Sequence, residues 1–428
     1  MPDGNILAHT TRALQVACEL KKLGHEVRFA TDGKYVPLIQ NAGFPCEPHL
    51  TLDPEETLEI CRQGRTNFYS PEFLARCVEE DCRLFERVRP NLILSDFRLS
   101  VSTSAEIAKI PHAEILNGLW TNYFTAPLTP PEGTIYDKIL GRAIVSRFPG
   151  FLVKWIKALT LRHDVRVHNQ LRRHYGLPLH RNLFDLWEGD INLIADIPEF
   201  APTRHLPSHF TYVGPLLWQP SLPMPSWIDK LDPARPTLYI TAGSSGNAKV
   251  FEEIIATLAD TEYQCLVTTA GLIDLSHSSA KNVFVTDFAP GEALIRKSDL
   301  VICQGGNGTV YQALRAGVPI IAYPTMHDQH FNMDQVCRLE MGTRLSLLPF
   351  RRDELMKTIE ETFRRREEYQ ARANLLASSF ARFTGEARAA EVIDRFLGGE
   401  MPPDELGDKS TEREEESTIG LPGALSPA

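Results

Sequence analysis

The chain has 428 residues, of which 43% are hydrophobic and 23% are charged, a composition typical of a globular protein with two or three domains. The formal net charge is −10, which argues against a nucleic-acid partner because contacts to phosphates need clustered cations. We find neither an apolar run long enough for a membrane span nor the pattern of a secretory signal. The eight cysteines lack CxxC spacing, so we expect reduced thiols in a cytoplasmic protein.

The C-terminal end differs in composition from the rest of the chain. Residues 398–428 contain eight acidic residues against Lys409 and Arg413, a net charge of −6, which leaves −4 for the other 397 residues. Large apolar residues are few there, so burial cannot offset the entropy lost on ordering. We therefore predict a disordered acidic tail over residues 398–428.

Short apolar runs alternate with helical patterns along the chain. The runs are LILSDF at 92–97, TLYIT at 237–241, QCLVT at 264–268, NVFVT at 282–286, DLVIC at 299–303 and VPIIA at 318–322. Strands that alternate with helices predict parallel sheets covered on both faces. The predicted fold class is α/β, with doubly wound, Rossmann-like domains.

A proline-rich segment divides the chain into two domains. Six prolines fall within residues 214–236, which is typical of an interdomain linker. We therefore place an N-terminal domain at 1–214, a linker at 215–235 and a C-terminal domain at 236–397. Two such domains facing one another would form a ligand cleft at the carboxyl ends of their strands.

The start of the N-terminal domain is unusual. MPDGN, residues 1–5, is a loop sequence that leads directly to a helical pattern at 9–27, without the buried strand that normally opens a doubly wound domain. A sheet without that strand would expose the edges of its two neighbours. Two interpretations stay open: a chain truncated at its start, which we favour, or a domain that forms without its first strand.

The most informative segment begins where the run DLVIC ends. The turn contains Gly305, Gly306, Asn307, Gly308 and Thr309, and a helical pattern follows at residue 310. Glycines let the backbone approach an anion, and a helix start adds free N–H groups and the positive end of the helix dipole. The turn suits a diphosphate, although any tight strand-to-helix connection also needs glycine.

Further motifs accompany this turn. They are AGVP at 316–319, the pair Asp328–Gln329 with Asn332, GSSG at 243–246 and FAP at 288–290. With them the chain, from Gly4 to about Phe396, resembles the family 1 nucleotide-sugar glycosyltransferases, which include plant, antibiotic and macrolide enzymes. The resemblance implies two facing Rossmann-like domains, the GT-B fold, and against that fold the sequence predicts an N-terminal domain without its first strand. The donor would lie on the C-terminal domain and the acceptor on the N-terminal domain.

The resemblance also implies donor-binding residues. The diphosphate would be held by Gly306, Asn307, Gly308 and Thr309, with Gln304 and Gly305 as further donor-site residues and Ser244 and Ser245 across the cleft. Phe288, Ala289 and Pro290 would lie by the nucleobase, and Asp328 and Gln329 would bind the sugar hydroxyls. For Asp328 and Gln329 the alternative is a solvated pair in a loop.

One donor-site residue departs from the family pattern. A histidine usually precedes the two glycines, whereas this chain has Gln304. A histidine can bring a positive charge to the leaving diphosphate, but a glutamine offers only a neutral N–H, and charge-assisted bonds are roughly twice as strong. Greater reliance on the helix dipole, a slow enzyme and a different donor all stay open.

Transfer of a sugar to a hydroxyl needs a base that removes the proton. His9, which we expect on the loop before the first helix, stands fifteen residues before Gly24, the offset of the family's catalytic histidine. Asp96, at the end of LILSD, matches the family's aspartate, which would fix the histidine tautomer and stabilise the imidazolium. The alternatives are a surface histidine at a helix start and an aspartate that caps the next helix.

The mechanism implied by the resemblance is a single inverting displacement without a metal or cofactor. His9 would take the acceptor proton, the acceptor oxygen would attack the anomeric carbon, and the diphosphate would leave towards residues 305–309. A helix end can supply the charge stabilisation that a metal ion otherwise provides.

The sequence predicts the acceptor-binding residues less specifically than the donor-binding residues. Aromatic residues gather between 117 and 175, and the resemblance implies that Trp120, Tyr123 and Phe124 line the acceptor pocket, although core packing explains any single one of them. Residues 138–173 contain nine basic residues against one acidic residue, Asp164. This segment fits either an anionic membrane surface or a solvated helix paired with acidic neighbours.

Together these features predict a hexosyltransferase that uses a uridine or thymidine diphosphate sugar and a small apolar acceptor, such as a natural product or a lipid. Two alternatives stay open. The first is a transferase that acts on a lipid acceptor at the inner face of the membrane. The second is a catalytically silent sugar-nucleotide-binding partner subunit, which Gln304 and the missing first strand favour.

Overall fold

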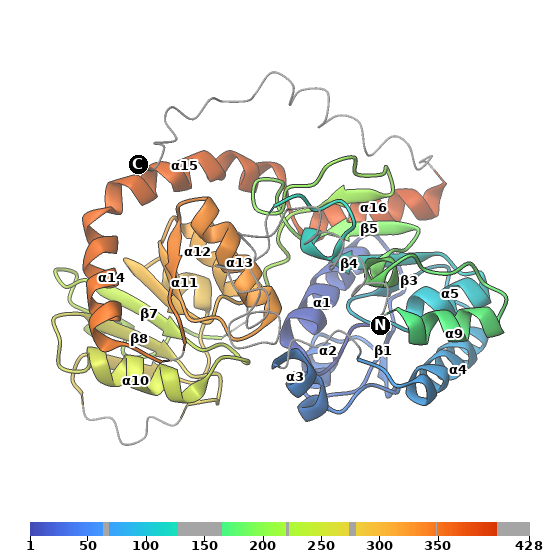
Figure 1. Cartoon of the computed structure of the whole chain (residues 1–428), viewed down its shortest axis with the longest axis horizontal. Coiled ribbons are helices and arrows are strands. Elements are labelled where there is room, and N and C mark those ends of the chain that lie inside the picture. Colours follow the sequence, from blue (N-terminus) through green and yellow to red (C-terminus); the bar gives the residue numbers. More distant parts are fainter. Residues whose placement is uncertain (63–67, 127–164, 220–221, 274–279, 348, 400–428) are drawn as a thin grey trace, which may run out of the picture.

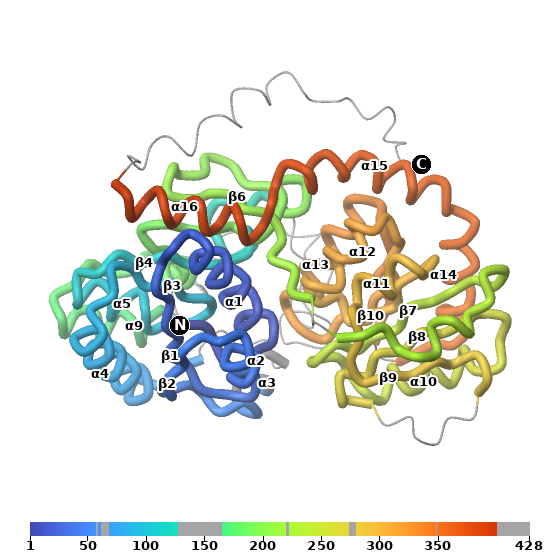
Figure 2. The backbone as a smooth tube through the Cα atoms, turned by 180° about the vertical axis from the view of Figure 1, so that it is seen from behind, coloured from blue at the N-terminus to red at the C-terminus, as the bar shows by residue number. Residues whose placement is uncertain are grey.

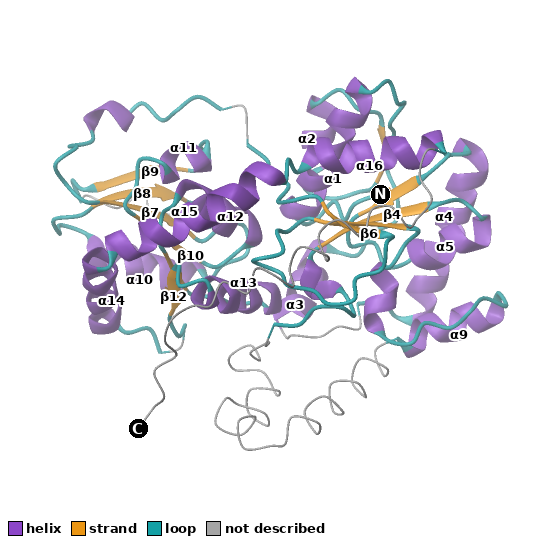
Figure 3. Ribbon diagram, turned by 90° about the horizontal axis from the view of Figure 1, so that it is seen from above, coloured by secondary structure: helices purple, strands orange, loops and turns teal. Residues whose placement is uncertain are grey.

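The structure is a computed structural model that describes residues 1–62, 68–126, 165–219, 222–273, 280–347 and 349–399. Two domains lie side by side, each built on parallel strands with helices packed around them (Figure 1, Figure 3). This arrangement confirms the predicted α/β fold class. The apolar runs of the sequence form the strands because central strands of a parallel sheet are buried on both faces.

The C-terminal domain is built on a six-stranded parallel sheet in the order β12–β11–β10–β7–β8–β9. The strands are β7 (Thr237–Thr241), β8 (Gln264–Thr268), β9 (Val283–Thr286), β10 (Leu300–Cys303), β11 (Ile320–Ala322) and β12 (Gly342–Arg344). From β7 the chain winds first to β8 and β9 and then to β10, β11 and β12 on the other side. The direction of winding therefore reverses between β7 and β10, which is where doubly wound domains bind ligands.

The helices of this domain are amphipathic and cover the two faces of the sheet. They are α10 (Ala248–Leu258), α11 (Gly291–Ile295), α12 (Asn307–Ala316), α13 (His327–Arg338), α14 (Arg352–Arg364) and α15 (Arg366–Arg382). In α10, for example, Phe251, Ile254 and Leu258 lie one helical turn apart and are fully buried. The Asn247 side chain caps this helix by accepting a hydrogen bond from the Val250 amide.

The N-terminal domain contains a four-stranded parallel sheet, β3–β4–β5–β6, and a separate parallel pair, β1–β2. The strands are β1 (Phe29–Ala30), β2 (Cys46–Glu47), β3 (Ile93–Ser95), β4 (His112–Leu116), β5 (Ile191–Ile194) and β6 (Phe210–Tyr212). The helices are α1 (Leu7–Lys22), α2 (Val36–Asn41), α3 (Pro54–Arg62), α4 (Pro71–Val88), α5 (Val101–Ala108) and α9 (Arg166–His174), with short 3-10 turns at Gly118–Trp120 and Leu183–Trp187.

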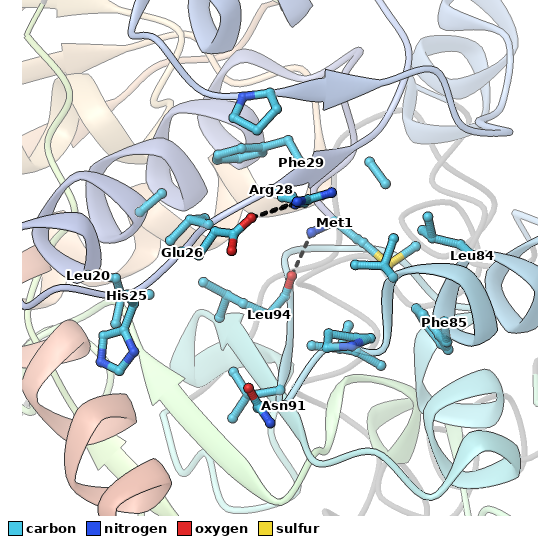
Figure 4. Close-up of a pocket in the computed structure, with 18 of the residues that line it drawn as sticks. Met1, Leu20, His25, Glu26, Arg28, Phe29, Leu84, Phe85, Asn91 and Leu94 are labelled. Carbon is cyan, nitrogen blue, oxygen red and sulfur yellow. Dashed lines mark hydrogen bonds and ion pairs between the residues drawn. The ribbon is translucent and has the colours of Figure 1, made fainter.

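The β1–β2 pair is separate from the four-stranded sheet that begins at β3. In the described residues no strand joins these two; instead the N-terminal segment, residues 1–3, lies beside β3. A cavity of about 760 Å³ adjoins this segment (Figure 4). Within the described residues, β1 and β3 therefore belong to separate sheets.

The last described helix corrects the predicted domain boundary. The sequence assigns residues up to 397 to the C-terminal domain, but α16 (Glu386–Gly398) crosses back and packs on α1 of the N-terminal domain (Figure 2). Its Ala389, Ala390 and Ile393 are buried in the same cluster as Ala13 and Leu14. The apolar face of α16 decides this placement, because it finds its complementary surface on α1 rather than on the neighbouring α15.

Two predicted surface segments fall largely outside the described residues. Residues 400–428 of the predicted acidic tail and residues 138–164 of the basic segment lie outside the described residues. In the described part of that segment, Arg172 of α9 is buried and pairs with Glu106, so this arginine belongs to the domain interior. No helix within the described ranges is both long and apolar enough to cross a membrane.

A buried carboxylate, Asp81 of α4, holds α4 to its neighbours. It accepts hydrogen bonds from His49 Nε2 (2.7 Å), Arg98 (2.9 Å) and the hydroxyls of Ser100 (2.6 Å) and Ser104 (3.0 Å). Burial alone would raise the pKa of Asp81, but the charge of Arg98 and the bonds from His49 and Ser100 outweigh it and lower the pKa to about 2. Asp81 therefore stays ionised and connects α4 with the segment after β2, which contains His49, with the segment after β3, which contains Arg98, and with the start of α5.

We expect Asp81→Asn to destabilise the protein by about 3–5 kcal/mol at pH 7, because the variant leaves the Arg98 charge buried without its partner. The folded-state pKa lies below the ordinary value of 3.8, so the stabilisation is complete above pH 4 and is lost as the pH falls towards 2. Urea unfolding of both proteins between pH 7 and pH 2.5 tests this expectation. A stability difference that stayed constant over this range would contradict it.

Candidate active site

The two predicted catalytic residues meet at the carboxyl end of β3. Asp96 follows β3 directly and is fully buried, and its Oδ1 lies 2.5 Å from His9 Nδ1. His9 lies within the first turn of α1 rather than on the preceding loop, because the helix begins at Leu7. Asp96 is not a helix cap, since α5 begins five residues later with Ser100 at its N-cap. With Nδ1 engaged by Asp96, Nε2 is the histidine nitrogen left to accept a proton.

Sequence reasoning missed Arg12, which shares Asp96 with His9. The Arg12 side chain donates to both carboxylate oxygens, from Nε to Oδ2 (2.8 Å) and from Nη2 to Oδ1 (2.6 Å). Burial alone would lower the pKa of Arg12, but the adjacent Asp96 carboxylate raises it, so the guanidinium stays charged. Arg12 lies three residues after His9 and thus on the same face of α1, a spacing that could have identified it.

A buried polar chain continues from Arg12 to the other domain. Arg12 Nη1 donates to Asn117 Oδ1 (2.7 Å), and Asn117 Nδ2 donates to Asp196 Oδ1 (3.1 Å). The same oxygen of Asp196 accepts a hydrogen bond from the Tyr311 hydroxyl (2.9 Å), and Tyr311 belongs to α12 of the C-terminal domain. Asp196 follows β5 as Asp96 follows β3, and the aspartate after an apolar strand is the sequence signal that could have found it. The chain links the His9–Asp96 pair to the helix that begins at the glycine turn.

An aromatic wall stands beside His9. The ring of Phe97 stacks on the imidazole, with centroids 4.8 Å apart and planes 8° from parallel. Trp187 and Trp120 pack on Phe97 and on one another (5.0–6.2 Å between centroids), and Phe68 packs on Phe97 edge-on at 5.3 Å. Phe97 has a left-handed backbone (φ 61°), which is uncommon for a residue other than glycine and turns the chain sharply after Asp96. Phe97, Phe68 and Trp187 were not predicted as site residues.

The three predicted acceptor residues have different surroundings. Trp120 belongs to the aromatic wall and is half-buried. Tyr123 packs on Phe210 of β6, and Phe124 packs on Phe331 of the C-terminal domain with ring centroids 5.0 Å apart. Of the three, therefore, Trp120 has the closest connection to the His9–Asp96 pair, while Phe124 contributes to the contact between the domains.

The glycine turn connects β10 to α12. Gly305 has a φ of +88°, and a Cβ there would lie 3.0 Å from Met333 Cγ and 3.1 Å from the Gln329 carbonyl oxygen, so the position requires glycine. Asn332 holds the turn from α13 by donating to the Gly305 carbonyl (2.9 Å). The helix begins at Asn307, three residues earlier than the sequence pattern predicts, with Gly306 as N-cap. Asn307, Gly308 and Thr309 therefore form the first turn of α12, whose backbone N–H groups lack helical partners.

Gln304 is buried under this turn. Its amide lies against two glycines: a Cβ on Gly243 would come within 2.1 Å of Gln304 Nε2, and one on Gly306 within 2.8 Å. Within the described residues Gln304 Oε1 is buried without a hydrogen-bond partner. Buried polar atoms are nearly always paired, so this amide is a candidate contact for a bound ligand.

The loops after β7 and β11 meet beside the turn. Gln329 Nε2 donates to Ser245 Oγ (3.0 Å), and Gln329 Oε1 accepts from the Thr325 amide (2.8 Å) and hydroxyl (2.9 Å). Gln329 is almost fully buried, so its amide braces the two loops and is not open to a sugar as the sequence prediction supposes. Ser244, by contrast, is exposed.

Asp328 lies in the first turn of α13 in the C-terminal domain. Burial raises its pKa, an effect opposed by its own amide, by the Gln329 amide and by the charge of His9. At the predicted nucleobase site, Phe288 is 58% exposed, whereas Ala289 is buried and Pro290 is half-buried, so Phe288 offers an open aromatic surface.

Two facing doubly wound domains, with a His–Asp pair at the strand ends of one and a glycine turn and helix start at those of the other, define a GT-B glycosyltransferase. Residues 237–386 match the Glycosyltransferase family 28 C-terminal domain. A PGL/p-HBAD biosynthesis rhamnosyltransferase of Mycobacterium bovis is 35% identical over 378 residues, 88% of this chain and 82% of the relative. A PGL/p-HBAD biosynthesis glycosyltransferase of Mycobacterium tuberculosis is 36% identical over 79% of this chain and 78% of its own.

Solved structures agree with the fold. The spinosyn rhamnosyltransferase SpnG complexed with thymidine diphosphate matches with a TM-score of 0.63 at 18% identity, covering 92% of this chain and 98% of that chain. The calicheamicin glycosyltransferase CalG4 matches with a TM-score of 0.65 at 18% identity, covering 93% and 97%. The chain belongs to the family 1-type glycosyltransferases of the GT-B fold, and it is a glycosyltransferase.

Proposed function

We propose that the protein transfers a hexose from a nucleotide-diphosphate sugar to a hydroxyl of an apolar acceptor, with inversion at the anomeric carbon and without a metal ion. The observation that carries this proposal is the His9–Asp96 pair at the carboxyl end of β3, which a chain of buried hydrogen bonds connects to Tyr311 of α12, the helix that begins at the glycine turn. His9 Nε2 takes the proton of the acceptor hydroxyl, and Asp96 stabilises the imidazolium that forms. The free N–H groups at the start of α12 stabilise the negative charge that develops on the leaving diphosphate.

The nature of the donor is supported by two kinds of relative. Two of the curated relatives above are a rhamnosyltransferase and a glycosyltransferase of PGL/p-HBAD biosynthesis, and SpnG is a rhamnosyltransferase that was solved with thymidine diphosphate. We therefore propose a thymidine diphosphate sugar as donor, with rhamnose as the first sugar to test. Acceptors of the PGL/p-HBAD kind suit the aromatic wall beside His9, because apolar and aromatic surface there can pack against an apolar acceptor. The assembled His9–Asp96 pair does not favour the catalytically silent alternative.

Donor binding tests this proposal directly. We expect thymidine diphosphate rhamnose to bind in calorimetry with a chelator present, and Asp328→Asn to weaken that binding by about 10- to 100-fold, because hydrogen bonds to a charged group contribute about 1.5–3 kcal/mol. Thymidine diphosphate without the sugar should bind both proteins equally, since Asp328 is proposed to contact only the sugar. Asp260→Asn is the matched control, because Asp260 is exposed at the far end of α10.

Two outcomes would count against the proposal. An equal loss of affinity for the sugar nucleotide and for the free diphosphate would mean that Asp328 supports the loop rather than the sugar. An absence of binding to thymidine and uridine diphosphate sugars alike would remove the proposed donor class.

A further inference from the structure

Three polar side chains form a row along the carboxyl edge of the N-terminal sheet. Asp96, Asn117 and Asp196 follow β3, β4 and β5, which are neighbours in that sheet. Arg12 of α1 joins the first two, since its guanidinium donates to both oxygens of Asp96 (2.6 and 2.8 Å) and to Asn117 Oδ1 (2.7 Å). Asn117 in turn donates to Asp196 Oδ1 (3.1 Å). The row therefore runs without a break from the His9–Asp96 pair to Asp196.

The Asp196 carboxylate is fully buried and is held by three donors. Its Oδ1 accepts from Asn117 and from the Tyr311 hydroxyl (2.9 Å), and its Oδ2 accepts from the Gly118 amide (2.8 Å). An ionised carboxylate only accepts hydrogen bonds, which matches this set of donors. Asp196 thus fixes groups from β4, from its own loop and from the other domain around one side chain.

Tyr311 connects α12 of the C-terminal domain to the end of this row. Its hydroxyl donates to Asp196 and accepts from the Ile197 amide (3.2 Å), and its ring packs on Phe200 with centroids 4.8 Å apart. Burial and the adjacent Asp196 carboxylate raise the pKa of Tyr311 well above its ordinary value, so the hydroxyl stays a donor. Tyr311 is therefore engaged by residues of the other domain through both its ring and its hydroxyl.

The segment that carries these contacts is embedded in the core of the C-terminal domain. Ile197, Phe200 and Ala201 are fully buried in the same cluster as Tyr311. Close-packed interiors transmit displacements, so α12 cannot shift without moving against Asp196. Since α12 begins at Asn307, one helical turn before Tyr311, the position of the glycine turn depends on the same contacts.

Filling the core requires the ring of Tyr311 but not its hydroxyl. A buried hydroxyl and a buried carboxylate each cost free energy to desolvate, and hydrogen bonds at best offset that cost. An apolar pair would fill the same space without it. What the polar pair adds is a fixed orientation of Asp196, and through Asn117 of Arg12, because a hydrogen bond is directional whereas apolar contact is not.

We propose that the hydrogen bond between Tyr311 and Asp196 positions the His9–Asp96 pair relative to the start of α12, and so relative to the leaving diphosphate. The inference rests on the proposed function, because it concerns the same transfer. Both are positioning residues that act through Arg12, whose Nη2 donates to Asp96 and lies 3.1 Å from His9 Nδ1. A displacement of about 1 Å between reacting groups can lower a rate by about 10²-fold, so a remote contact of this kind affects kcat.

Tyr311→Phe tests the proposal, because it keeps the ring and removes one hydroxyl. We expect kcat to fall by about 10- to 100-fold. The KM for the donor should change by less than about twofold, since the hydroxyl is not proposed to touch the donor. Tyr239→Phe is the matched control: it removes a buried hydroxyl of the same domain, bonded to Thr268 (2.7 Å), and should leave kcat unchanged. An equal fall in both variants would overturn the proposal.

A double variant tests whether the hydroxyl acts through Asp196. Asp196→Asn places an NH₂ group against one of the three donors and should lower kcat at least as much as Tyr311→Phe. Combining the two substitutions should lower kcat no further than Asp196→Asn alone, because the second change removes a contact that is already lost. Losses that multiply would show that Tyr311 acts by another route and would overturn the proposal.

A readout that does not depend on transfer separates this inference from the proposed function. In protein with isotope-labelled histidine rings, the His9 signals are those absent from His9→Ala. Tyr311→Phe should move these signals, because Arg12 lies against the ring, and Tyr239→Phe should not. Unmoved signals with unchanged kcat would overturn the inference alone. Moved signals in a protein that transfers no sugar would overturn the proposed function and leave the connection between the domains standing.

Discussion

His9→Ala is expected to lower kcat for sugar transfer by about 10²–10⁴-fold while leaving the affinity for the donor unchanged. The range is that of a positioned general base, and His9 meets the geometric requirement because Asp96 holds its Nδ1 at 2.5 Å and Phe97 stacks on its ring. The proposed donor site lies on the other domain, so removal of the imidazole should not change the groups proposed to bind the diphosphate. Steady-state kinetics with saturating donor, together with calorimetry of donor binding, measures the two quantities separately.

A matched control separates this effect from a general loss of a histidine. His174→Ala removes an exposed histidine at the end of α9, far along the chain from the His9–Asp96 pair, and should leave kcat unchanged. A decrease of less than tenfold in His9→Ala would mean that another group removes the acceptor proton. An equal loss of donor affinity would mean that His9 is part of the donor site.

The second large effect is expected on stability, from Arg12→Leu. The substitution leaves the Asp96 carboxylate, which is fully buried, without the guanidinium that donates to both of its oxygens. Loss of one partner of a buried ion pair costs about 3–5 kcal/mol, because the remaining charge is desolvated and unpaired. We expect a decrease of this size in the free energy of unfolding measured in urea at pH 7.

Two further variants test the reason for this loss. Arg12→Leu combined with Asp96→Asn removes both charges, and it should recover more than half of the stability lost by the single variant. Arg12→Lys keeps the charge but not the planar pair of donors, so it should be intermediate. A double variant no more stable than Arg12→Leu alone would show that packing of the Arg12 side chain, and not its charge, stabilises the fold.

A chain of hydrogen bonds connects Arg12, beside the His9–Asp96 pair, with Tyr311 of α12 in the C-terminal domain. Asp196 receives hydrogen bonds from Asn117 and Gly118 of its own domain and from Tyr311 of the C-terminal domain. Burial raises the pKa of Asp196, and these donors together with Arg12 oppose the rise. The position of α12, which begins at the turn proposed to bind the donor, is therefore connected through fully or partly buried hydrogen bonds to Arg12, which donates to both oxygens of Asp96.

Most strands, and the motifs that follow them, can be predicted from local patterns in the sequence. Apolar runs such as DLVIC and TLYIT form β10 and β7 because a strand covered on both faces needs no polar residue, and that pattern is local. The glycine turn after β10 could also be predicted from the sequence. The positive φ of Gly305 and the start of the next helix both depend on residues that are close together in the chain.

Tertiary structure alone decided which residues meet. Arg12 and Asp96 are 84 residues apart, and their bidentate contact depends on how α1 lies across the end of β3. From the sequence, Gln329 is predicted to contact the donor sugar. In the structure its side-chain amide forms hydrogen bonds with Thr325 and Ser245, in the loops after β11 and β7. The helix α16 follows the C-terminal domain in the chain and yet belongs to the core of the N-terminal domain. Such placements depend on complementary apolar surfaces far apart in sequence, and no pattern of neighbouring residues contains that information.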